Sequence, residues 1–117
     1  MGHVYAEVKI GDPGKQITQA MLVDTGATYM CLPEQLAQKI GVHPERYTEV
    51  SLADGTRVKA GIALSPIEMN GRQTVVQVLI FNIVEPVVGA FTLEALGLAV
   101  DPVSGELKPT RSFITRA

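Results

Sequence analysis

The chain has 117 residues, of which 46% are hydrophobic and 19% are charged, with a formal net charge of −2. This balance is typical of one globular domain, here residues 1–117, and excludes a largely disordered chain. The ten Lys and Arg residues are scattered and the longest apolar runs are far shorter than the roughly 18 residues of a membrane span, so neither nucleic acid nor a membrane is expected as partner.

The first quarter of the chain is patterned as two strands. The amino terminus has no basic region followed by an apolar stretch, so we expect no signal peptide and a cytoplasmic protein, although a domain cut from a longer chain would have the same pattern. Residues 3–10 alternate between the two faces of a strand, with one face formed by Val4, Ala6, Val8 and Ile10. A Gly- and Pro-containing turn at 11–15 leads to a second strand at 16–23, which becomes wholly apolar in its last four residues.

The next segment, after a polar turn at 24–28, predicts a short extended piece and then a helix. Residues 29–33 are extended, and Pro33 suits the first turn of a helix that ends at Gly41. Cys31, in the extended piece, is the only cysteine. It can form no intrachain disulfide, and we expect a buried apolar thiol rather than a nucleophile.

The rest of the chain predicts hairpins and one more helix. Asp54-Gly55 and Asn70-Gly71 are dipeptides of tight hairpin turns, and they separate strands at roughly 48–53, 56–68 and 72–81. A short apolar strand in 85–91 is closed by Gly89, and residues 92–97 form a short helix capped by Thr92. A strand, a turn and another strand follow in 98–109, and the tail 111–117 is compatible with one more strand.

Candidate catalytic groups reduce to one carboxylate. His3 and His43 are far apart with no acidic neighbour at ligand spacing, so no metal or other cofactor is expected, and no serine lies in a nucleophile-elbow context. Asp12, Asp54 and Asp101 lie in turns that Asp stabilises.

Asp24 differs from these turn residues because it follows a wholly apolar strand, where an unpaired carboxylate is costly. Gly26 lets the backbone curl so that amide hydrogens point at the carboxylate, and Thr25 and Thr28 add hydroxyl groups. Either Asp24 is a turn residue that follows a strand, or it is held in a cleft because it does chemistry.

The chain resembles the retroviral-type (retropepsin-like) aspartic peptidases, most of all the small stand-alone prokaryotic-type members. The resemblance is carried by "LVDTGAT" at 22–28, by "VVG" at 87–89 and by the short helix "TLEALG", and it extends from about residue 4 to 109. It implies a closed β-barrel-like acid-protease half with one or two short helices, active as a symmetric homodimer. Each subunit would contribute one Asp24, and the two carboxylates would share a proton and activate water against a polypeptide substrate.

The resemblance also implies roles for the neighbouring residues. The active-site loop would be supported by Thr25, Gly26, Ala27 and Thr28, with Thr25 bonding across the twofold axis and Gly89 packing closely beneath the loop. The hairpin at roughly 48–61 would be the flap over the substrate, with its tip at Ala53, Asp54, Gly55 and Thr56. Apolar pocket walls are expected from Leu22, Val58, Ile62, Val87 and Val88.

The chain departs from the retroviral pattern at three places: the flap tip is charged and poor in glycine, Thr28 replaces an acid, and Ala90 replaces an arginine. Two other interpretations remain open. One is a non-catalytic member of the same fold that acts as a dimerisation or peptide-binding module. The other is an unrelated β-barrel binding domain in which Asp-Thr-Gly is merely a turn, and a monomer with Asp24 exposed would support it.

Overall fold

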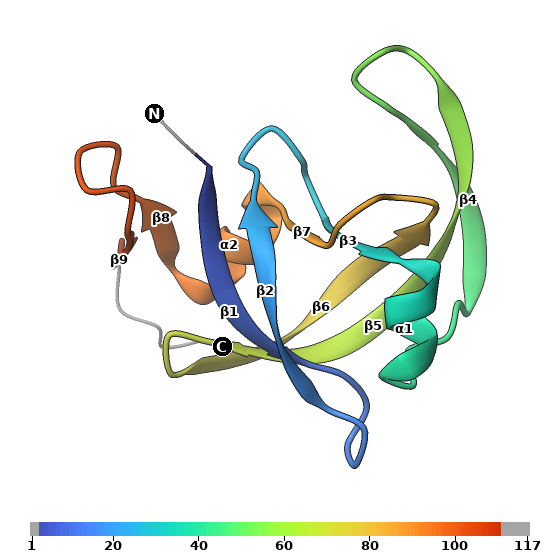
Figure 1. Cartoon of the computed structure of the whole chain (residues 1–117), viewed down its shortest axis with the longest axis horizontal. Coiled ribbons are helices and arrows are strands. Elements are labelled where there is room, and N and C mark those ends of the chain that lie inside the picture. The colour runs from blue at the N-terminus through green and yellow to red at the C-terminus, as the bar shows by residue number, and fades with distance from the viewer. Residues whose placement is uncertain (1–2, 111–117) are drawn as a thin grey trace, which may run out of the picture.

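The computed structural model describes residues 3–110, and strands dominate it (Figure 1). The strands are β1 (Val4–Ile10), β2 (Ile17–Val23), β3 (Met30–Pro33), β4 (Arg46–Ser51), β5 (Arg57–Met69), β6 (Arg72–Phe81), β7 (Val87–Val88), β8 (Leu98–Val100) and β9 (Leu107–Pro109). The helices are α1 (Glu34–Lys39) and α2 (Ala90–Leu96). The further strand predicted for 111–117 lies outside the described residues. No helix within 3–110 is both long enough and apolar enough to cross a membrane.

Six of the strands form a closed barrel in the order β1-β2-β7-β3-β6-β5. The ring closes where Lys9 and Ile10 of β1 pair with Glu68 and Ile67 of β5. Strand β4 lies outside the ring and pairs only with β5, while β8 and β9 form a separate two-stranded sheet. The expected mostly-β, closed-barrel domain with two short helices is confirmed.

The period-2 alternation of the strands divides the apolar side chains between two clusters. One face of β1 points into the barrel as predicted, where Val8 and Ile10 are fully buried, and Val78 and Ile80 of β6 join them. The other faces of β3, β6 and β7, together with β5, form a second cluster of Cys31, Ala60, Leu79, Phe81 and Val87. Residues from the β4–β5 hairpin, among them Val50 and Leu52, pack against this second cluster.

The predicted helix is present as α1, but Pro33 is its N-cap rather than part of its first turn, and the helix ends before Gly41, which has a φ of 73°. The predicted cap of α2 was wrong. The helix begins at Ala90 with Gly89 as its N-cap, and Thr92 is buried within the helix. The physical reason is that backbone carbonyls of the 24–28 loop accept hydrogen bonds from the first amides of α2, so that no hydroxyl cap is needed. Strand β7 is correspondingly shorter than expected.

Candidate active site

The Asp24 loop is tied to β7 at its first residue. The amide of Asp24 donates to the carbonyl of Val88 (2.9 Å), and the amide of Ala27 donates to the carbonyl of Asp24 (3.0 Å), which closes the turn. The amide of Gly26 donates to Oδ1 of the Asp24 carboxylate at 2.9 Å. Gly26 therefore approaches the carboxylate through its backbone, in the way that its lack of a side chain led us to expect.

The far side of the loop rests on α2. The amides of Ala90 and Phe91 donate to the carbonyls of Ala27 (2.8 Å) and Thr28 (2.9 Å). A Cβ atom on Gly89 would lie 2.5 Å from the Tyr29 carbonyl oxygen and 2.7 Å from the Thr28 carbonyl group. Gly89 is therefore required for the close approach of these two backbones, and the expected close packing beneath the loop is confirmed.

The Asp24 side chain is not buried within one chain. Asp24, Thr25 and Gly26 are all exposed in the single subunit. The apolar part of β2 ends at Val23, so the carboxylate lies just beyond the strand, at the surface. Its exposure means that any burial of this group depends on a second molecule, and that burial stays a prediction.

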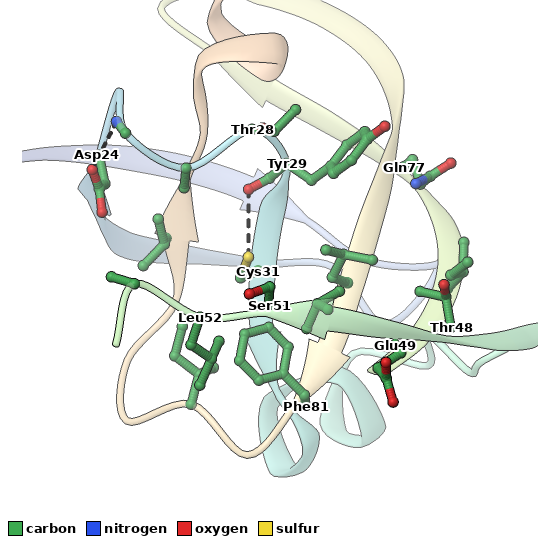
Figure 2. A pocket seen from close by; sticks show the side chains of 18 residues that line it. Asp24, Thr28, Tyr29, Cys31, Thr48, Glu49, Ser51, Leu52, Gln77 and Phe81 are labelled. Atoms are coloured by element: carbon green, nitrogen blue, oxygen red, sulfur yellow. Dashed lines mark hydrogen bonds between the residues drawn. The ribbon is translucent and has the colours of Figure 1, made fainter. Parts of the chain in front are cut away.

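A groove of about 690 Å³ runs from the Asp24 loop beneath the β4–β5 hairpin (Figure 2). Asp24 lies at one end of it, and Thr48 and Gln77 lie at the other. The residues around it come from the loop, the hairpin and the second cluster: Asp24, Gly26, Ala27, Thr28, Tyr29, Cys31, Thr48, Glu49, Val50, Ser51, Leu52, Ala53, Ile62, Gln77, Leu79, Phe81, Ile83 and Val87. Most of its walls are apolar, and Asp24 and Glu49 are its charged members.

The groove contains some of the predicted substrate-binding residues and not others. Ala53, Ile62 and Val87 line it, as do Ala27 and Thr28 of the loop, whereas Thr25 does not. The hairpin tip, formed by Asp54, Gly55 and Thr56, is exposed and lies outside the groove. Val88 points the other way, into the barrel core, because neighbouring residues of a strand face opposite sides. Leu22 and Val58 pack against the second cluster without lining the groove.

Sequence reasoning missed several groove residues on β6 and beside the loop. Gln77, Leu79 and Phe81 alternate along one face of β6, so the period-2 pattern could have placed them together once the core face was known. Tyr29 was also missed. Its ring packs edge-on against Phe91 of α2, with ring centres 6.0 Å apart, and no local pattern signals that contact.

The chemistry of Cys31 differs from that of a nucleophile. Burial, together with the nearby charge of Asp24, raises the pKa of the Cys31 thiol to about 11. Its Sγ atom donates to the Tyr29 carbonyl at 3.5 Å. The thiol is therefore neutral near pH 7, and the expected buried, unreactive cysteine is confirmed. Within residues 3–110, no three His, Cys, Asp or Glu side chains gather where they could hold a metal ion.

The turn of the hairpin is ordered by its own backbone and by Asp54. The amide of Leu52 donates to the Thr56 carbonyl (2.7 Å), and the amide of Gly55 donates to the Leu52 carbonyl (2.9 Å). The amide of Thr56 donates to the Asp54 carboxylate at 2.8 Å, and hydrogen bonding to Thr56 lowers the pKa of that carboxyl group. Asp54 is thus a turn residue, as predicted.

A closed barrel with an Asp-Thr-Gly loop next to a groove beneath a long hairpin agrees with what the resemblance to the retroviral-type aspartic peptidases implies. A family model described as "gag-polyprotein putative aspartyl protease" matches residues 7–95. The chain belongs to this family. The match includes the Asp24 loop, the hairpin, Gly89 and most of α2, and it ends before β8. No curated protein matches the chain.

Proposed function

We propose that the protein is an aspartic endopeptidase in which two Asp24 carboxylates, one from each subunit of a homodimer, activate water for hydrolysis of a peptide bond. The observation that supports this most is the placement of Asp24. Its carboxylate is oriented by the Gly26 amide, is exposed in the single chain and lies at the end of a groove of about 690 Å³. The family of the chain supports the same activity.

The chemistry needs two carboxyl groups, because one must take a proton while the other gives one. The ionised group accepts a proton from water as its oxygen attacks the carbonyl carbon, and the protonated group donates its proton to the carbonyl oxygen. Two carboxylates about 3 Å apart cannot both ionise, so such a pair holds one proton in its working state. One chain supplies one Asp-Thr-Gly loop, so this mechanism requires a second copy.

The groove favours an extended polypeptide with apolar side chains near the cleaved bond. Leu52 of the hairpin and Phe81, Ile83 and Val87 of the wall provide an apolar surface for them. Burial of such side chains contributes about 25 cal/mol for each Å² removed from water, which holds the substrate while the carboxyl groups act. The hairpin would act as the flap over the bound chain.

The decisive test is the substitution Asp24→Asn, assayed with a mixed peptide library. Asn has nearly the same shape but cannot act as a general base, so we expect folding to persist and turnover to fall by at least about 10²- to 10⁴-fold. Asp12→Asn is the matched control, because it removes the same charge at an exposed turn. Wild-type turnover should pass through a maximum at mildly acidic pH, since the pair works with one proton. An Asp24→Asn protein that cleaves at the wild-type rate would end this proposal.

A non-catalytic peptide-binding or dimerisation module is the alternative, and one observation favours it. The bond from the Gly26 amide to Asp24 has the same form as the bonds from Thr56 to Asp54 and from Val103 to Asp101, which only order turns. On this alternative, peptides bind but are not cleaved at any pH. Peptide binding and turnover measured on the same wild-type sample therefore separate the two functions.

A further inference from the structure

The β4–β5 hairpin leaves the barrel at a single point on β5. Gly61 pairs with Ile80 of β6 on one side and with Tyr47 of β4 on the other, so it belongs to both the barrel and the hairpin. Beyond Gly61, residues 57–60 of β5 pair only with β4. The hairpin therefore rises from the barrel as a two-stranded ribbon (Figure 1). Isolated two-stranded ribbons twist readily and are only marginally stable, so contacts at the base decide their direction.

At that base, the ring of Pro44 packs directly on Gly61. A Cβ atom on Gly61 would lie 2.6 Å from Cγ and 2.7 Å from Cβ of Pro44, and 3.5 Å from Cε2 of Tyr47. Gly61 does not have a positive φ, so space rather than backbone conformation requires glycine here. The amide of Glu45 donates to the Ile62 carbonyl at 2.8 Å, which holds Pro44 in place from the next residue.

The part of the hairpin beyond Gly61 covers the groove. Residues 48–53 all line it, and Val50 and Leu52 pack against the second cluster below. Because residues 57–60 pair only with β4, the hairpin joins the sheet at its base alone, and a small rotation at Gly61 moves these side chains by a larger amount. The position of residues 48–53 over the groove therefore depends on how closely Pro44 approaches Gly61.

We propose that the contact between Pro44 and Gly61 is a positioning contact that sets the angle of the hairpin over the groove, and so the affinity for the polypeptide. The inference rests on the proposed function in that it assigns the groove to a polypeptide substrate. Neither residue lines the groove, so their effect would act through the strands of the hairpin.

The test introduces a steric clash at Gly61 and then removes it with a second substitution at Pro44. Gly61→Ala should tilt the hairpin and weaken binding of a reference peptide, measured as a rise of about tenfold in KM with a smaller change in kcat. Pro44→Gly should restore binding in the double variant, because the nearest remaining atom to the new Cβ is then Cε2 of Tyr47 at 3.5 Å. Pro44→Ala should restore it less, because the Cβ atom of residue 44 is retained.

A second readout does not depend on catalysis. Amide hydrogen exchange should be faster across β4 in Gly61→Ala, should be unchanged in β1 and β2, and should slow again in the double variant. Val8→Ala is the control for general destabilisation, because Val8 is fully buried in the barrel core. In this variant, amide exchange in β4 should increase no more than amide exchange in the rest of the chain. Binding of the reference peptide is also measured in the Asp24→Asn background, so that a failure of the proposed catalysis does not hide the effect. Unchanged β4 exchange in Gly61→Ala, or a defect that Pro44→Gly does not relieve, would overturn the inference.

Discussion

At the residue scale, Asp24 and Cys31 lie on the same groove and have opposite properties. Asp24 is exposed and oriented by a backbone amide, whereas Cys31 is only 8% exposed. The charge of Asp24 adds to the effect of burial in keeping the thiol protonated. Two potentially reactive groups thus lie near each other, and the fold leaves only the carboxylate available for acid–base chemistry.

The raised pKa of Cys31 predicts a loss of stability in alkali. The unfolded chain releases this proton near pH 8.5, whereas the native protein holds it up to about pH 11. In that window the native state binds more protons than the unfolded state, so the free energy of unfolding falls as pH rises, by on the order of 2 kcal/mol. Urea denaturation at pH 8 and pH 10.5 measures this fall. In Cys31→Ala the fall should be smaller, and an identical fall in both proteins would contradict the assignment.

At the element scale, the tip of the hairpin requires a conformation that most residues avoid. Gly55 has a φ of 87°, and no atom lies within 4 Å of the position of its Cβ. Gly55→Val would therefore strain only the backbone of the turn. We expect a loss of peptide turnover with little change in folding stability, because the tip is exposed. Gly71→Val is the matched control, with a φ of 74°, equally open surroundings and a position outside the groove. Equal turnover in the two variants would mean that the hairpin is not a working flap.

At the junction between the Asp24 loop and α2, lack of space rather than backbone conformation requires glycine, because backbone atoms surround the Cβ position of Gly89. Gly89→Ala would place a methyl group against the carbonyls of Thr28 and Tyr29, neither of which can rotate away. We expect a loss of about 1–3 kcal/mol in unfolding free energy, together with displacement of the loop and lower activity. Thermal denaturation measures the first effect, and Ala20→Val on the exposed face of β2 should change stability little. A Gly89→Ala protein as stable as wild type would contradict this account of the junction.

At the scale of the whole molecule, the proposed mechanism needs two carboxyl groups, and one chain supplies a single Asp-Thr-Gly loop. We expect a homodimer with a mass of twice the 12.5 kDa of one chain, which sedimentation at micromolar concentration would measure. Full activity in a sample that sediments as a monomer would refute the shared site.

Mixing of subunits tests the shared site more directly. When wild-type and Asp24→Asn chains are refolded together in equal amounts, random pairing leaves roughly a quarter of the dimers with two Asp24 residues. Activity per wild-type chain should then fall to about half, whereas independent sites would leave it unchanged. Adding Asp12→Asn chains in place of Asp24→Asn chains controls for the refolding step.

Elements that depend on local order could be predicted from the sequence alone. Alternating side chains on β1, the turns at Gly55 and Gly71, the presence of helix α1 and the Asp-Thr-Gly loop were all predictable, because period, turn chemistry and motif are written in neighbouring residues. The same motif placed Gly26, Ala27 and Thr28 beside Asp24, and all three line the groove.

Features made by residues far apart in the chain could not be predicted without the fold. The cap of α2 was mispredicted because its partners are carbonyls some 60 positions earlier, which no local pattern reveals. The groove gathers residues from the loop, the hairpin and β6, so the place of Gln77 and Phe81 in it, and of Val88 outside it, followed from which face of each strand met the core. The exposure of Asp24 in the single chain likewise depends on where β2 ends relative to the barrel surface. Pairing and packing between distant segments fix these features, and a single sequence carries no direct record of them.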